Sequence, residues 1–183
     1  SFQYNERSRA LWNPNASSWG GFSNIWFDYL CRLGGEVKTR WPHMRISSLA
    51  YMRHYDVPTF EIPDNIDVMI ALMRTSMASK EPSVFEKNLA HVRKWSEYMK
   101  GDRNRLYLWE YGEWPAMNGV TPPLLCPFAM QKWLQAVRPH VSGVFFEWYD
   151  PPEYSLMARL WARLLWDPDL DVAAEIPDVC RRL

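Results

Sequence analysis

Two stretches of the sequence end an apolar run on a glutamate that lies between aromatic residues. In LYLWEYGEWP (106–115) the glutamate is Glu110, and in GVFFEWYDPP (143–152) it is Glu147. Carboxyl groups transfer protons and attack the anomeric carbon of a sugar, so a pair of them can hydrolyse a glycosidic bond. Aromatic rings stack on sugar rings and exclude water from a nearby carboxyl group. The two stretches therefore predict a carbohydrate site with Glu110 and Glu147 as its acid/base and nucleophile.

Other predicted strand ends supply further candidates. Glu6 follows a short apolar stub at residues 1–4 and is the third candidate catalytic carboxylate. The predicted substrate contacts are polar or aromatic residues close to strand ends: Asn5, Tyr51, Trp109, Tyr111, Trp114, Trp148 and Tyr149. Each carboxylate also has a purely structural alternative, because a glutamate at a strand end can accept hydrogen bonds from loops or pair with an arginine. The tryptophans at helical spacing are expected in the core, and they are Trp95, Trp133 and Trp161.

The chain carries no recognisable pattern for a metal or a nucleotide. The three cysteines, Cys31, Cys126 and Cys180, are widely spaced, and the four histidines form no HxH or HExxH motif. No GxGxxG or GxxxxGK[ST] motif follows an apolar run. We therefore expect neither a metal nor a cofactor.

Short, nearly continuous apolar runs alternate with longer amphipathic segments along the chain. Strands are predicted at 44–52, 66–73, 105–111 and 143–149, with residues 1–4 as the end of another. Helices are predicted at 24–41, 83–99, 124–140 and 153–166, with a further short helix in the tail 169–183. This order is typical of an α/β protein with a parallel sheet, either open or part of an eight-stranded barrel. In both architectures ligands bind beyond the carboxyl ends of the strands, so the candidates are expected to converge there on one face.

The bulk composition limits the partners. The 183 residues suit a single domain, and the 21 basic and 21 acidic residues balance, with no Lys/Arg run longer than two. This balance argues against a nucleic-acid partner bound through its phosphates. No apolar run reaches the 18 residues of a membrane span. Eleven tryptophans are many for this length and suit a surface that stacks on ring-shaped ligands.

Five phrases in order resemble a known group of proteins. They are LCRLGGEVKTRWP, ISSLAYM, DNIDVMIAL, LYLWEY and VSGVFFEW, and with the tail they extend over residues 22–175. They resemble bacterial glycoside-hydrolase-like barrel domains of unknown function, and the tail EYSLMARLWARLLWDPDLDVAAEI is similar to the last barrel helix of the related α-glucuronidases. Asn5-Glu6 is similar to the Asn-Glu pair after the fourth strand in the largest glycosidase clan, which gives Glu6 and Glu110 as a rival catalytic pair.

The resemblance implies a TIM barrel, of which this chain is the C-terminal half, about strands four to eight of a (β/α)₈ fold. It implies one partial domain over residues 1–183, with the N-terminal part of the barrel missing. It also implies a carbohydrate substrate, other domains of the same polypeptide as partners, and a secreted or periplasmic location.

Three functions are compatible with these features. The first is a glycoside hydrolase-like domain that cleaves a polysaccharide or oligosaccharide with paired carboxylates. The alternative is a non-catalytic carbohydrate-binding barrel that keeps the aromatic rings without the carboxylate geometry. The third, a lyase or isomerase acting on a sugar acid, would need a metal cluster or a catalytic lysine at a strand end, and the sequence offers neither.

Overall fold

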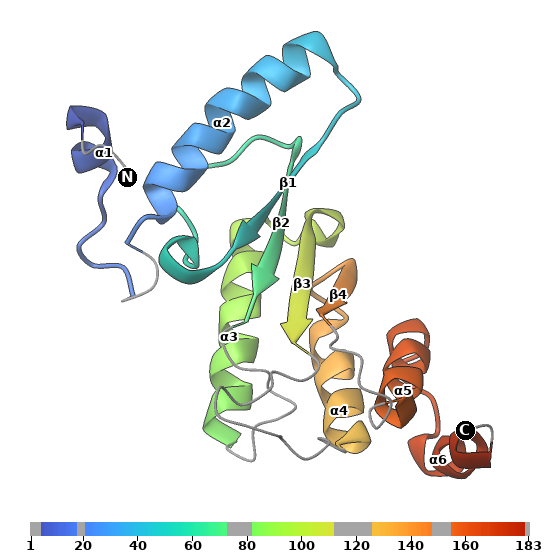
Figure 1. Cartoon of the computed structure of the whole chain (residues 1–183). Coiled ribbons are helices and arrows are strands. Elements are labelled where there is room, and N and C mark those ends of the chain that lie inside the picture. The colour runs from blue at the N-terminus through green and yellow to red at the C-terminus, as the bar shows by residue number, and fades with distance from the viewer. Residues whose placement is uncertain (1–4, 18–20, 73–81, 112–125, 148–154, 182–183) are drawn as a thin grey trace.

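A computed structural model describes residues 5–17, 21–72, 82–111, 126–147 and 155–181. Four strands and six α-helices follow one another in this part of the chain (Figure 1). The strands are β1 (Ile46–Ala50), β2 (Ile66–Ala71), β3 (Leu106–Tyr111) and β4 (Gly143–Glu147). The helices are α1 (Glu6–Leu11), α2 (Ser23–Arg40), α3 (Pro82–Tyr98), α4 (Pro127–Val137), α5 (Ser155–Trp166) and α6 (Val172–Arg181). Two short 3₁₀ turns complete the list, η1 (Met52–His54) and η2 (Arg103–Arg105).

The four predicted internal strands form one parallel sheet in the order β1-β2-β3-β4. The α/β fold predicted from the alternating pattern is therefore confirmed, and β1 and β2 are joined without an intervening α-helix, as expected. The strand stub at residues 1–4 lies outside the described residues. Helix α1 was not predicted, and it places Glu6 in the first turn of a helix. Asn5 is the N-cap of this helix, and its side-chain oxygen accepts a hydrogen bond from the Ser8 backbone N–H at 2.9 Å.

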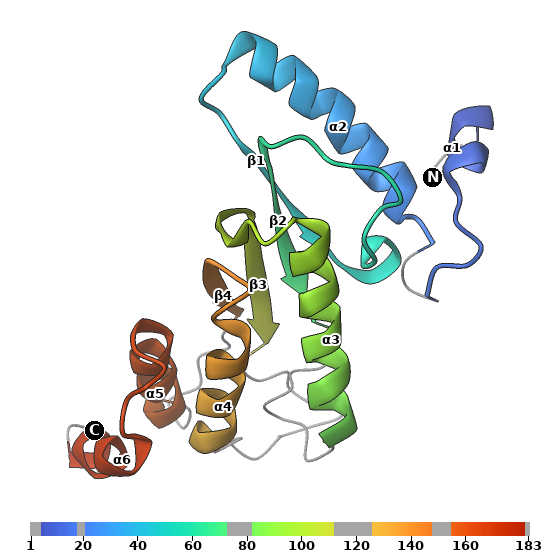
Figure 2. The same cartoon turned by 180° about the vertical axis from the view of Figure 1, so that it is seen from behind.

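The helices that contact the sheet cover the same face of it. Trp26 of α2 donates its indole N–H to Ser48 of β1 at 2.9 Å, and Trp133 of α4 donates to Glu110 of β3 at 2.7 Å. The ring of Trp161 in α5 lies 3.9 Å from that of Phe146 in β4. Figures 1 and 2, seen from opposite sides, show α3 and α4 together on one side of β3. We call this side the helix face and the opposite side the open face.

Alternation along the strands divides the sheet residues between these two faces. The helix face is apolar and buried, and Leu106 and Leu108 of β3 are both 0% exposed. The open face carries larger aromatic side chains from β3 and β4, which are Tyr107, Trp109, Tyr111 and Phe145. Phe145 is 46% exposed, so this face is not covered to the degree of the helix face.

Three tryptophans anchor the core between the sheet and its helices. Trp95 and Trp133 are 0% exposed and Trp161 is 2% exposed, which confirms their predicted place in the core. The Trp95 ring packs against Phe27 of α2 at 5.5 Å, so α2 and α3 share this core. None of the helices in the described part of the chain combines the length and hydropathy that crossing a bilayer requires.

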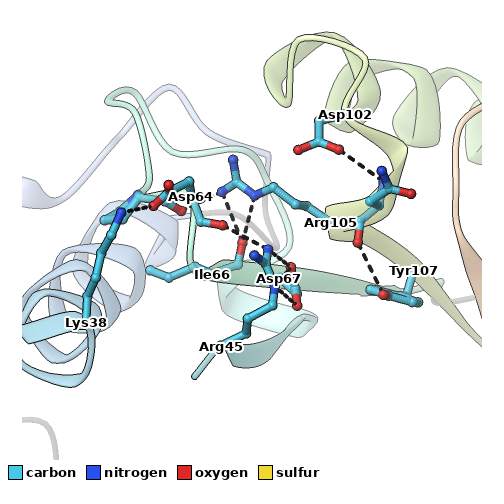
Figure 3. Close-up of polar contacts among 10 residues, drawn as sticks. Lys38, Arg45, Asp64, Ile66, Asp67, Asp102, Arg105 and Tyr107 are labelled. Carbon is cyan, nitrogen blue, oxygen red and sulfur yellow. Dashed lines mark hydrogen bonds and ion pairs between the residues drawn. The ribbon is translucent and has the colours of Figure 1, made fainter. Parts of the chain in front are cut away.

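The amino ends of the strands are held by charged side chains (Figure 3). Arg45 pairs with Asp67, and its Nη2 and Nε atoms lie 2.5 and 2.9 Å from the two carboxylate oxygens. Arg105 donates to the Ile66 carbonyl at 3.0 and 3.2 Å and to the Pro63 carbonyl at 2.5 Å. Lys38 of α2 pairs with Asp64 at 2.5 Å. Together these bonds hold the last part of the link between β1 and β2, which contains no α-helix, at the amino ends of the strands.

Helix α2 runs unbroken through Gly34-Gly35, although this pair weakens a helix in isolation. Gly34 is needed because α2 approaches β2 closely there. A Cβ at Gly34 would lie 3.3 Å from Ile66 Cδ1 and 3.3 Å from Asn65 Oδ1, whereas one at Gly35 would meet nothing within 4 Å. The Asn65 amide also donates to the Gly34 carbonyl at 2.9 Å.

The two neighbouring glycines form a matched pair for a test of this packing. Gly35→Ala should raise the free energy of unfolding by up to about 1 kcal/mol, because alanine is the better helix former and the site is open. Gly34→Ala should be less stable than Gly35→Ala by about 1 kcal/mol or more, because the added methyl crowds Ile66 and Asn65. Urea unfolding of both variants measures the difference. Equal stability of the two variants would contradict the close approach.

Candidate active site

The carboxyl ends of the four parallel strands lie together at one end of the sheet, and both predicted glutamates are found there. The register pairs Glu110 with Phe146, and Tyr111 with Glu147. Because paired residues of neighbouring strands point to the same face, Glu110 lies on the helix face and Glu147 on the open face. Both carboxylates therefore lie at the carboxyl ends of their strands, as expected, but their side chains point to opposite faces of the sheet.

Glu147 is a half-buried carboxylate that a tryptophan holds on the open face. The indole N–H of Trp109, on the neighbouring strand, donates to Glu147 Oε2 at 2.9 Å. The Trp109 ring lies 4.3 Å from the Phe145 ring and 6.4 Å from the Tyr111 ring, at interplanar angles of 41° and 51°. The open face thus presents an oriented carboxylate oxygen beside a group of aromatic rings at the carboxyl ends of β3 and β4.

Glu110 has the opposite environment. It is 0% exposed, its Oε1 accepts the Trp133 indole N–H at 2.7 Å, and its Oε2 is buried without a hydrogen-bond partner among the described residues. Burial raises the pKa of Glu110 to about 8, although the Trp133 hydrogen bond acts in the opposite direction. At neutral pH Glu110 is therefore mainly a protonated, uncharged acid on the helix face of the sheet.

Two further titratable groups, Tyr55 and His91, lie on the helix face of the sheet in the region of Glu110. The rings of Tyr55 and His91 are stacked at 3.7 Å and nearly parallel, at 4°. Burial lowers the pKa of His91 to about 4, and no residue that the structure describes forms a hydrogen bond with its Nε2. Burial is also the main cause that raises the pKa of Tyr55, with smaller effects from Asp56 and Glu110. At neutral pH this interior therefore holds its ionisable groups mainly in their uncharged forms.

The remaining predicted site residues divide into three groups. Glu6 is exposed on α1, and the Asn5 side chain is occupied by capping that helix, so neither is brought to Glu110 or Glu147 by a contact among the described residues. Tyr51 directly follows β1 and keeps extended backbone angles, so alternation places its side chain on the open face at the carboxyl edge. The last group, Trp114, Trp148 and Tyr149, lies outside the described residues.

Sequence reasoning missed two of the open-face rings and one contact of a core tryptophan. Phe145 and Tyr107 share the open face with Trp109 and Glu147, and their period-two spacing from these residues was the available signal. Trp133 was expected only to fill the core, but it also donates the hydrogen bond to Glu110. Nothing in the sequence pattern connects positions 110 and 133, because their contact depends on where α4 packs.

Metal ligation finds no support in the part of the chain that the structure describes, since no three His, Cys, Asp or Glu side chains are grouped there to hold an ion. No curated protein and no solved structure matches the sequence. One family model does match, over residues 6–183 and so over nearly the whole chain. The chain belongs to the family described as Domain of unknown function (DUF4838).

Proposed function

We propose that the chain forms part of a (β/α)₈ barrel of the glycoside-hydrolase type, and that residues 1–183 are one partial barrel domain. The sequential order β1-β2-β3-β4 supports this, because successive right-handed crossovers then place every helix on the same face, as in a barrel. A doubly wound sheet reverses its strand order instead. Among the described residues the outer edges of β1 and β4 are unpaired, and further strands at these edges would complete the barrel.

In such a barrel the open face of the sheet lines the interior, and ligands bind at the carboxyl ends of the strands. We infer that this end binds a polysaccharide or oligosaccharide and that the domain hydrolyses its glycosidic bonds. The observation that carries the proposal is the Trp109–Glu147 hydrogen bond on the open face, beside Phe145 and Tyr111. It combines an oriented carboxylate with rings that can stack on a sugar. The resemblance of the tail to α-glucuronidases adds to this argument.

Glu147 has the role of the nucleophile or general base in this proposal. The Trp109 indole N–H donates to Glu147 Oε2 at 2.9 Å and so orients this carboxyl group on the open face. Glu110 faces the helix layer, and Glu6 lies on α1, so the geometry of the described residues favours neither as the partner of Glu147. The proton donor of the reaction would then come from a residue outside the described ranges.

The alternative is a non-catalytic barrel that only binds carbohydrate. It is favoured by a specific observation, namely that Glu147 is the one predicted catalytic carboxylate that the described residues place on the open face. A screen of the natural full-length protein against aryl glycosides and aryl uronides, paired with calorimetric titration of oligosaccharides, separates the two. Turnover supports the hydrolase. Saccharide binding without turnover of any substrate supports the binding barrel, and neither binding nor turnover contradicts both.

Trp109→Phe tests whether the Trp109 hydrogen bond positions Glu147 for catalysis. The variant keeps an aromatic ring against Phe145 but removes the N–H that holds Glu147 Oε2. We expect kcat on an aryl glycoside to fall about tenfold, because one hydrogen bond to a charged group contributes roughly 1.5–3 kcal/mol and part of its effect is positional. Tyr107→Phe is the matched control, because its hydroxyl donates to the Asn104 carbonyl at 3.2 Å, near the opposite end of β3. Equal activity of Trp109→Phe and the wild type would contradict the positioning role.

A further inference from the structure

A concave surface lies between α1 and α2, apart from the carboxyl ends of β3 and β4. Its volume is about 440 Å³, within the range of roughly 300–1,000 Å³ that is typical of small-molecule sites. Helix α2 lines it with residues of one helical face, at positions 25, 28, 29 and 32, and α1 lines it with Arg7, Ser8 and Leu11. The proposed hydrolysis gives this groove no role.

Three charged side chains form the polar part of the groove. Arg7 binds Asp28 through Nη2 at 2.5 Å and through Nε at 3.0 Å, and Arg32 Nε adds a contact at 3.3 Å. The Asp28 side chain is only 15% exposed, whereas both arginine side chains are 60% exposed. The arginines therefore use both carboxylate oxygens of Asp28 and keep further N–H groups available. Two cations face one anion here, so the lining carries a surplus positive charge.

An aromatic wall lies next to these charges. Tyr29 is 48% exposed, and its ring centroid lies 5.9 Å from that of Trp26. The Trp26 N–H is already used inside the fold by Ser48, so Trp26 offers the groove its ring and no donor. The Arg32 guanidinium lies 6.0 Å from the centroid of the Tyr29 ring, which brings a donor group next to this wall.

The uncharged polar group at the end of the groove is also a donor. Asn5 Oδ1 accepts the Ser8 backbone N–H at 2.9 Å, and the Ser8 hydroxyl donates to the Asn5 carbonyl at 2.9 Å. The acceptor oxygen of the Asn5 side chain is thus occupied, which leaves its NH₂ group for a ligand. The groove therefore combines guanidinium and amide donors with a flat apolar wall.

We propose that this groove is a binding site for a six-membered-ring compound that carries a carboxylate, with the carboxylate on the guanidinium groups of Arg32 and Arg7 and the ring on Tyr29. A planar guanidinium and a planar carboxylate match in geometry and form strong charge-assisted hydrogen bonds. The ring contact on Tyr29 adds apolar area and selects a ring-bearing ligand over a simple inorganic anion. An aromatic acid and a sugar acid share this chemistry.

Two pairs of ligands that differ only in the carboxylate test the site on the natural full-length protein. Benzoate is compared with benzyl alcohol, and galacturonate with galactose, in titrations followed through the arginine Nε–H signals by NMR. At least one of the two acids should bind with a dissociation constant of about 1 mM or better, and its uncharged counterpart at least about tenfold more weakly. The acid that binds identifies the source of the ring.

Arg32→Gln should weaken binding of that acid at least about tenfold. Arg40→Gln is the matched control, because Arg40 lies on the same helix with a similar exposure and pairs with Glu36, at 3.7 Å, outside the groove. The Nε–H signals of Arg7 and Arg32 report on the groove itself, so failure of the hydrolase proposal would not affect this result. Equal binding of acid and uncharged ligand, no binding of either acid, or equal losses in Arg32→Gln and Arg40→Gln would overturn the proposal.

Discussion

Replacing Glu147 by Gln in the natural full-length protein is expected to lower kcat on an aryl glycoside by about 10²–10⁴-fold. The amide keeps the size of the side chain, and its oxygen can still accept the Trp109 N–H that now lies 2.9 Å from Glu147 Oε2. What it removes is the negative charge that, in the proposed reaction, attacks the sugar or takes a proton from water. Because Glu147 is half-buried and at a strand end, the fold should survive, which far-ultraviolet circular dichroism checks.

Glu110→Gln is the control for this experiment. Glu110 lies at the same edge of the sheet, but it faces Trp133 and is mainly protonated at neutral pH, so an uncharged amide resembles its native state. Its kcat should stay within about threefold of the wild type if, as we propose from its burial on the helix face, Glu110 does not touch the substrate. Loss of turnover in Glu110→Gln together with full activity in Glu147→Gln would reverse the assignment and restore Glu110 as the catalytic residue.

Glu110→Gln should also change how stability depends on pH. Glu110 keeps its proton in the folded state up to a pKa of about 8, whereas its ordinary value is 4.5. Between these values the unfolded chain loses this proton first, so the contribution of Glu110 to the free energy of unfolding falls as pH rises. At pH 7 the native glutamate costs about 3 kcal/mol relative to a group that cannot ionise. The variant should therefore match the wild type near pH 4.5 and exceed its stability by about this amount at pH 7.

Urea unfolding at pH 5, 7 and 9 measures this difference. His91 produces the opposite slope, because its pKa of about 4 in the folded state makes the protein less stable as pH falls below the ordinary value of 6.5. His91 is present in both proteins, so its effect cancels when the two curves are subtracted. Parallel curves from pH 5 to pH 9 would show that Glu110 is not held protonated by burial.

The elements of this fold could be predicted from sequence because each carries a local signal. The near-continuous apolar run of β2 is typical of a strand buried on both faces. The apolar stripe of α3 matches the periodicity of an amphipathic helix. Helix α1 has only six residues, too few to establish a helical stripe, and its signal is the Asn5 cap alone. Its absence from the predicted elements is a consequence of its length.

The face of the sheet to which each glutamate side chain points could not be predicted, for a different reason. Glu110 precedes the last residue of β3, and Glu147 is the last residue of β4, so their parity depends on the register between the two strands. A shift of that register by one residue would place both carboxylates on the same face. Register is set by packing of the helix face, including Phe146 on Trp161, and this packing is not encoded in either strand segment alone.

The consecutive order of the strands also has a kinetic meaning. Every described strand pairs with the next one in the chain, so each pairing closes a loop formed by a single connection. The link between β1 and β2 contains no α-helix and closes the shortest of these loops. Short loops cost less conformational entropy to close, and proteins rich in such contacts fold faster than those built from distant pairings. The β1–β2 pair is therefore suited to nucleate the sheet, with β3 and β4 added at one growing edge in the order in which a ribosome would deliver them.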